Sequence, residues 1–239
     1  WGALFRAASL LHLKGFSPEE KAVLVFSTCF CYDKENTSIL GEEKTAMEST
    51  ALLEALHVAE RLKDATRHCY TSKGRHESVA EHSWRAALMA YFLRDEFPEA
   101  DMGKVMLMCI LHDLGESFTG DIPTFDKTQA DEVREEDLLS RWLTSLPEPY
   151  ATEMAGLFEE MAQRSTIEAK IFKAIDGLEA LIQHNESDLS TWIPREYELN
   201  LTYAQDKTAF SPYLAALRQD IREETLRKME REGQPEACR

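Results

Sequence analysis

An almost unbroken series of helix signals runs through residues 48–232, and it constrains the fold more than any other feature of the sequence. Within residues 48–65, leucine and alanine recur every three or four positions, which is the spacing of one helical face. Ser78 and Glu81 form a capping box that begins a second helix, and Pro98 ends it. Similar signals predict a third helix that begins after Asp101. They also predict helices over residues 127–146, 149–162, 165–184 and 212–232. The sequence therefore predicts an all-α fold, a single helical bundle.

Glycine and capping residues predict where these helices begin and stop. Gly115 is expected to end the third helix in the left-handed conformation that glycine adopts readily, with a loop over residues 116–126 behind it. Ser165 and Glu168 are expected to form a second capping box. Residues 189–203, which contain Trp192 and Pro194, are expected to be irregular.

The N-terminal region differs from the rest of the chain. The sequence does not begin with Met, and Met47 is a plausible alternative start. Residues 1–13 are expected to form a short amphipathic helix, and residues 21–30 either an apolar strand or a buried helix. The predicted organisation is an N-terminal extension of uncertain structure over residues 1–46, followed by one domain over residues 47–239.

The net charge opposes binding to nucleic acid or to a membrane surface. The 27 Lys and Arg residues stand against 43 Asp and Glu residues, which gives a formal net charge of −16. Such a charge repels phosphate polymers and anionic bilayers. The longest apolar stretch, residues 22–31, is shorter than the roughly 18 residues that a membrane helix needs. Neither a nucleic-acid polymer nor a membrane is therefore expected as a partner.

The cysteines favour a reducing compartment. There are five of them, an odd number without any CxxC pair, so neither a disulfide framework nor a thiolate zinc site is predicted. The alternative is a redox or metal site at Cys29 and Cys31. The expected location is the cytoplasm.

Three of the predicted helices carry ionisable residues on apolar faces. His82 lies on the helix that follows the first capping box, His112 and Asp113 lie at the end of the next helix, and Asp176 lies within residues 165–184. Burying such groups without partners costs several kcal/mol, so we expect them to share one partner if the helices pack together. Two nitrogen and two oxygen donors suit one divalent cation, and Mn, Co, Fe, Ni and Zn are all compatible with this set. Coordination positions would remain open for water or substrate, as in catalytic sites.

Four motifs resemble those of the HD-domain metal-dependent phosphohydrolases, most closely the 5′-deoxynucleotidase-like branch. They are SVAEH at 78–82, LHDLGE at 111–116, GDIP at 120–123 and AID at 174–176, and the resemblance spans about residues 54–184. It implies a helical fold with one divalent ion held by His82, His112, Asp113 and Asp176. Dinuclear relatives draw extra histidines from the interval between Asp113 and Asp176, which here contains none, so a single ion is expected.

The same resemblance implies roles for residues around the ion. Positions matched by Glu116 and Asp121 are acidic and catalytic in that branch, and an arginine matched by Arg67 engages the substrate phosphate. His68 follows that arginine where the branch commonly has a tryptophan involved in selecting the sugar, so His68 is a candidate substrate contact and the base and sugar stay open. On the residues alone, further candidate phosphate contacts are Lys73, Arg75 and Lys127.

The expected reaction is hydrolysis of a small phosphorylated metabolite, foremost a (deoxy)nucleoside 5′-monophosphate, to nucleoside and phosphate. Glu116 and Asp121 would share the acid and base roles, in either assignment. The alternatives are a non-catalytic module that binds metal or nucleotide, and a pyrophosphate or alarmone hydrolase of the same fold. Because relatives are often dimeric, apolar residues at 1–31 and around Trp192 are expected between the subunits of a homodimer.

Overall fold

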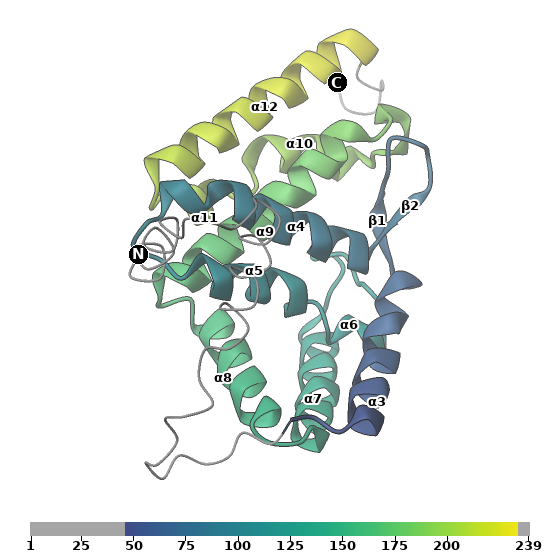
Figure 1. The fold of residues 1–239 in the computed structure, drawn as a ribbon. Coiled ribbons are helices and arrows are strands. Elements are labelled where there is room, and N and C mark those ends of the chain that lie inside the picture. Colours follow the sequence, from purple (N-terminus) through teal and green to yellow (C-terminus); the bar gives the residue numbers. More distant parts are fainter. Residues whose placement is uncertain (1–45, 234–239) are drawn as a thin grey trace, which may run out of the picture. The chain divides into compact units, whose positions relative to one another are not determined.

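The structure, a computed structural model, describes residues 46–233. This part of the chain is helical apart from one short hairpin, so the all-α prediction is confirmed (Figure 1). The expectations for residues 1–13 and 21–30, and for a subunit contact made by residues 1–31, lie outside the described residues. The division of the chain after residue 46 stays a prediction.

The α-helices begin and end close to the predicted positions over most of the domain. They are α3 (Ser49–Glu60), α4 (Val79–Leu93), α5 (Met102–Leu111), α6 (Glu116–Thr119), α7 (Gln129–Ser145), α8 (Tyr150–Gln163), α9 (Ile167–Glu186), α10 (Pro194–Thr202), α11 (Gln205–Thr208) and α12 (Pro212–Glu232). Short 3-10 helices cover Arg61–Lys63, Arg94–Glu96 and Leu189–Thr191. The first capping box is confirmed, since Ser78 Oγ accepts from the Glu81 amide and a Glu81 carboxylate oxygen accepts from the Ser78 amide.

The core is built around α9. This helix packs against α4 and α5 on one side and against α8, α11 and α12 elsewhere, and α4 and α5 pack against each other (Figure 1). Ile171, Ile175 and Leu178 of α9 are fully buried together with Val105 and Met108 of α5. Burying large apolar side chains supplies the main stabilisation of such a bundle. The polar groups that α4, α5 and α9 carry on these same faces are therefore brought into the interior.

A hairpin precedes α4, and the sequence analysis did not predict it. Strand β1 (Thr66–Tyr70) pairs antiparallel with β2 (His76–Ser78), in the register Thr66 to Ser78 and Tyr70 to His76. Gly74 turns the chain between the strands at a φ of 79°, a conformation that glycine adopts without strain. The hairpin runs directly into the N-cap of α4, so it fixes the position of β1 relative to that helix.

Two predicted helix ends are wrong for identifiable reasons. Gly115 has a right-handed φ of −58° and is the N-cap of α6 instead of ending a helix. A Cβ there would lie 2.8 Å from Glu135 Cγ, so a larger residue would require the Glu135 side chain to shift. The left-handed glycine is Gly120, with a φ of 75°, at the end of α6. Thr166 rather than Ser165 caps α9, its hydroxyl accepting from the Ala169 amide.

Residues 189–203 are more regular than predicted, because they contain a 3-10 turn and α10. Pro194 occupies the first turn of α10, where its missing N–H costs nothing. Trp192 is buried against Leu189, Tyr197 and Met229, and its indole N–H donates to Ser187 Oγ. Trp192 itself therefore packs within the protomer, and a homodimer contact made by the residues around it stays a prediction.

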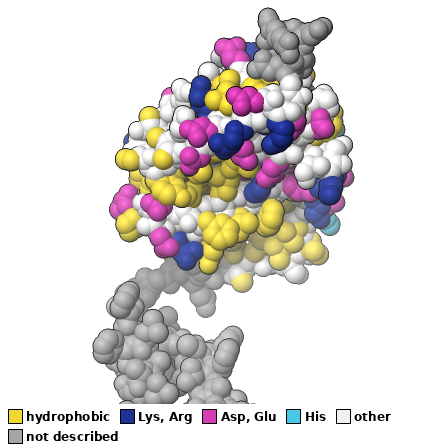
Figure 2. All heavy atoms as spheres, turned by 90° about the horizontal axis from the view of Figure 1, so that it is seen from above, with side chains coloured by type: hydrophobic (Ala, Val, Ile, Leu, Met, Phe, Trp, Pro, Cys, Tyr) yellow, Lys and Arg dark blue, Asp and Glu magenta, His cyan; other side chains and the backbone are white. Residues whose placement is uncertain are grey.

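The surface of the described residues carries mixed charges on the face drawn in Figure 2. Acidic and basic side chains are interspersed with hydrophobic ones on the face seen in Figure 2, and the basic ones form no continuous stripe there. Within residues 46–233, every helix is too short or too polar to cross a membrane.

Candidate metal and phosphate site

The structure brings together the four side chains that the sequence analysis assigned to a metal ion. Asp176 Oδ1 lies 3.2 Å from His82 Nε2 and 3.6 Å from His112 Nε2. Asp113 Oδ2 lies 3.0 Å from His112 Nε2 and 3.8 Å from His82 Nε2. We call these four residues the central cluster. His82, His112 and Asp113 place their ligand atoms within 4.8 Å of one another, and Asp176 adds a carboxylate oxygen beside both imidazoles, so the cluster could accept one cation.

Packing of three helices determines where the central cluster forms. His82 lies one turn into α4 and is fully buried, and Asp176 lies at the middle of α9. His112 is the first residue after α5, at the helix end, so the neighbouring Asp113 is able to turn toward the same point. Successive residues of a continuing helix would diverge by about 100°. The end of α5 therefore makes the paired ligands possible.

Outer hydrogen bonds orient both imidazoles. His82 Nδ1 contacts a carboxylate oxygen of Glu179, and His112 Nδ1 is 2.9 Å from the Cys109 carbonyl oxygen, to which it donates. These bonds leave Nε2 of each ring facing the carboxylates. His112 Nε2 is buried and has no hydrogen-bond partner of good geometry within the described residues. Such second-shell contacts are typical of metal-binding histidines.

The central cluster stabilises positive charge. Burial opposes protonation of His112, but Asp113 and Asp176 outweigh it and raise the pKa of His112 to about 10. Burial also opposes ionisation of Asp176, yet Lys173 and the two histidines hold its pKa well below the usual range. Lys173 Nζ lies 2.7 Å from Asp176 Oδ2. The site thus favours cationic groups, as a metal site with anionic ligands should.

A cavity of about 550 Å³ adjoins the cluster. Asp113 and Asp176 line it. The side chains of His82 and His112 are buried next to these two carboxylates and do not line the cavity themselves. The other predicted site residues also line it, namely Arg67, His68, Glu116 and Asp121. Of the alternative phosphate contacts Lys127 lines it, whereas Arg75 is exposed and pairs with Glu81 at 2.8 Å, away from the lining residues.

Glu116 and Asp121 are held in a desolvated environment. Glu116 is 7% exposed and one of its carboxylate oxygens has no hydrogen-bond partner within the described residues. Burial, followed by the charges of Asp113 and Asp121, raises the pKa of Glu116 to about 9. Burial also raises the pKa of Asp121, although Arg67 acts in the opposite direction. Carboxyl groups with raised pKa values are able to hold or exchange a proton near neutral pH.

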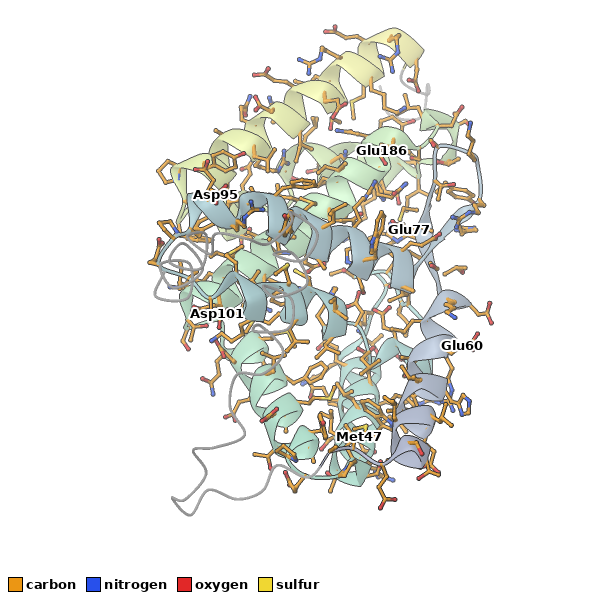
Figure 3. The ribbon with its side chains drawn as sticks, viewed as in Figure 1. Met47, Glu60, Glu77, Asp95, Asp101 and Glu186 are labelled. Carbon is orange, nitrogen blue, oxygen red and sulfur yellow. The ribbon has the colours of Figure 1, made fainter. Side chains whose placement is uncertain are left out.

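Arg67 is fixed beside the central cluster by carboxylates on two elements. Its Nε lies 3.2 Å from Glu77 Oε2, and its Nη1 lies 3.7 Å from Asp113 Oδ2. Figure 3 shows Glu77 on the hairpin beside the start of α4. Only 12% of the Arg67 side chain is exposed, and this residue lines the cavity. Its guanidinium donors are therefore available to a ligand in the cavity rather than to bulk solvent.

The sequence analysis named His68 but missed its neighbours His184 and Glu196, and it also missed Glu179. His68 Nε2 lies 3.0 Å from Glu196 Oε1, and the His68 ring packs edge-on against Phe125 and His184. Glu179 orients His82 and also binds Arg85 Nε at 2.5 Å. Glu179 could have been found, because it follows Asp176 by three residues and shares its helical face. His184 and Glu196 had no such signal, because they meet only in the folded chain.

Buried histidines and carboxylates that converge beside a polar cavity in an all-α bundle are typical of metal-dependent hydrolases. The profile of the HD domain family matches residues 59–218. The chain belongs to the HD domain family, and the resemblance to HD-domain metal-dependent phosphohydrolases is confirmed.

Named relatives and one solved structure agree with this assignment. The 5′-deoxynucleotidase HDDC2 of Homo sapiens is 32% identical over 140 residues, which are 57% of this chain and 68% of that protein. The 5′-deoxynucleotidase hdd1 of Schizosaccharomyces pombe is 28% identical over 165 residues, 62% of this chain and 82% of that protein. The crystal structure of a predicted metal-dependent phosphohydrolase from Magnetospirillum magnetotacticum MS-1 has a TM-score of 0.66 at 28% identity, covering 75% of this chain and 93% of that one.

Proposed function

We propose that this chain is a metal-dependent phosphohydrolase that converts (deoxy)nucleoside 5′-monophosphates into nucleoside and phosphate. The observation that carries the proposal is the shared cavity, which the carboxylates of the central cluster, Arg67 and the desolvated Glu116 all line. The names of the relatives from Homo sapiens and Schizosaccharomyces pombe support the same substrate class. A volume of about 550 Å³ lies in the range of small-molecule sites and favours a monomeric nucleotide over a polymer.

The donor set fits one divalent cation. His82, His112, Asp113 and Asp176 would hold it, and His112 Nε2, which is buried without a hydrogen bond of good geometry, faces the two carboxylates. When bound, such an ion lowers the pKa of a water ligand and polarises a phosphoryl oxygen. Mn, Co, Fe, Ni and Zn all accept this mixture of nitrogen and oxygen ligands.

The chain's own residues supply the remaining chemistry. Arg67 would bind the phosphate through its planar set of N–H donors, held in place by Glu77. Glu116 and Asp121 would move the proton between the attacking water and the leaving oxygen. His68 lines the same cavity next to Arg67, so a bound substrate would lie beside it.

A substrate panel tests this function. The purified full chain, loaded separately with Mn²⁺, Co²⁺ and Zn²⁺, should release orthophosphate from several deoxynucleoside and nucleoside 5′-monophosphates and more slowly from sugar phosphates. Pyrophosphate as the product would indicate the alarmone-type alternative. Absence of turnover with every metal, alongside intact nucleotide binding, would indicate a non-catalytic binding module and contradict the proposal.

Replacing Arg67 by lysine should lower kcat/KM by about 10- to 100-fold while the metal content stays unchanged. Lysine keeps the charge but loses the planar pair of donors, and a hydrogen bond to a charged group contributes about 1.5–3 kcal/mol. Steady-state kinetics and metal analysis measure the two quantities. Arg75→Lys is the matched control, because Arg75 is exposed and pairs with Glu81. Equal kinetics for Arg67→Lys and wild type would remove Arg67 from the phosphate site.

A further inference from the structure

A second group of potential metal ligands lies in the wall of the same cavity. His68 comes from β1, His184 from the last turn of α9 and Glu196 from the first turn of α10, and all three line the cavity. We call them the His–Glu cluster. Glu196 Oε1 lies 3.0 Å from His68 Nε2 and 3.8 Å from His184 Nε2. Their potential ligand atoms all lie within 4.8 Å of one another.

The arrangement repeats the geometry of the central cluster. There, two imidazole Nε2 atoms face Asp176 Oδ1 at 3.2 and 3.6 Å, and here two Nε2 atoms face Glu196 Oε1 at 3.0 and 3.8 Å. Ligand atoms about 2.1 Å from a tetrahedral ion lie roughly 3.4 Å from one another. The distances in both clusters scatter around this separation.

Hydrogen bonding accounts for only part of the His–Glu cluster. The contact between His68 Nε2 and Glu196 Oε1 has hydrogen-bond length, whereas His184 Nε2 is 3.8 Å from the same oxygen, which is too far. The second carboxylate oxygen of Glu196 accepts from the Ile193 amide at 2.7 Å. This bond anchors the carboxylate and leaves Oε1 directed at both rings.

The pKa shifts of His184 and Glu196 favour the ionisation states that bind a metal. Burial lowers the pKa of His184 to about 4, so its ring is neutral at physiological pH. Burial raises the pKa of Glu196, but the hydrogen bonds from His68 and from the Ile193 amide act against it, and the net pKa is lowered. A neutral imidazole and an ionised carboxylate are the ligand forms that bind divalent ions.

We propose that His68, His184 and Glu196 hold a second divalent transition-metal ion. A set of two histidines and one carboxylate leaves coordination positions for water or for an anionic ligand in the cavity. The absence of histidines between Asp113 and Asp176 does not bear on this site, because its histidines lie outside that interval. The His–Glu cluster therefore gives the cavity a second point of attraction for an anionic molecule.

The second ion should bind more weakly than the first. Both imidazoles of the central cluster have outer contacts, with Glu179 and with the Cys109 carbonyl. The Nδ1 atoms of His68 and His184 have no hydrogen-bond partner within residues 46–233. Outer contacts of this kind are worth about 10- to 100-fold in metal affinity, and we expect a difference of that size between the two sites.

Titration of the metal-free full chain with Co²⁺ tests the second site without reference to turnover. Calorimetry and visible absorption should show two equivalents for the wild type, the second about 10- to 100-fold weaker. His68→Gln and His184→Gln should each lose the weaker equivalent and keep the tighter one. His112→Ala should lose the tighter equivalent and keep the weaker one.

The matched control is His57→Gln, because His57 is an exposed histidine of α3 and should leave both equivalents in place. Circular dichroism shows whether each variant is folded, and the two histidine variants act on different elements, so both are not expected to fail. A single equivalent in the wild type would overturn the proposal. So would a second equivalent that persists in both His68→Gln and His184→Gln, because it would then come from surface carboxylates.

Discussion

Replacing His112 by alanine should give a folded protein that has lost the metal of the central cluster and about 10³-fold in kcat. His112 Nε2 lies within 3.0 Å of Asp113 and 3.6 Å of Asp176, so its removal opens the ligand set on one side. Metal-assisted activation of water and phosphate is worth several kcal/mol, and each 1.4 kcal/mol is a factor of ten in rate. Metal analysis after gel filtration and phosphate release measure the two losses.

Two comparisons separate a lost ligand from a damaged core. His112→Gln fills most of the space of the ring without offering the same nitrogen, so it should behave like His112→Ala in both assays. His57→Ala removes an exposed histidine and should match the wild type. If His112→Ala kept the wild-type metal content at the central cluster, the ligand assignment would be wrong.

Glu116→Gln should act in opposite directions on activity and on stability. Loss of the ionisable carboxyl should lower kcat by about 10²- to 10⁴-fold, the usual contribution of general acid–base catalysis. The same change should stabilise the metal-free protein at neutral pH. The reason is that burial raises the pKa of Glu116 from 4.5 to about 9, so its ionised form is unfavourable in the folded state.

The raised pKa of Glu116 determines how the stability of the folded protein changes with pH. Between the unfolded pKa of 4.5 and the folded pKa of about 9, the folded protein binds more protons than the unfolded chain at Glu116. Stability from this group is therefore fully present below the lower value and is lost as pH rises toward the upper one. From about pH 5.5 to about pH 8, the metal-free wild type should lose roughly 3 kcal/mol relative to Glu116→Gln.

Denaturant unfolding of both proteins after chelation of metal measures this difference. Glu132→Gln is the control, because Glu132 is exposed near the cavity rim and should show no comparable change. Unfolding free energies of wild type and Glu116→Gln that stay parallel across this pH range would show that Glu116 is not desolvated. Unchanged kcat in Glu116→Gln would remove it from the proton transfer.

The central cluster could be predicted from the sequence because its members lie on, or directly after, helices with a strong periodic signal. His82 shares a face with Val79 and Ala86, and Asp176 lies within a buried apolar run, so helix packing alone brings them together. The end of α5 at Leu111 placed His112 and Asp113 as a pair. The bundle as a whole followed from the same periodicity.

Short strands, and contacts between residues far apart in the sequence, were not predictable in this way. The strands of the hairpin have five and three residues, too few for an alternating pattern to stand out. Gly115 was expected in a left-handed conformation, because the need for space near Glu135 comes from α7, which follows later in the chain. The His–Glu cluster joins residues 68, 184 and 196, whose meeting depends on tertiary packing rather than on local sequence.

The single helix α9 carries Asp176 at one cluster and His184 at the other, and this sets the scale of the cavity. Eight residues of helix separate them, a rise of about 12 Å along the axis. A helix is stiff on this length, so the span acts as a molecular ruler between the two ends. Inserting one residue between them would rotate the His184 imidazole by about 100° around the helix axis and leave the Asp176 carboxylate in place. The helical rise of α9 thus sets how long a ligand must be to contact both clusters.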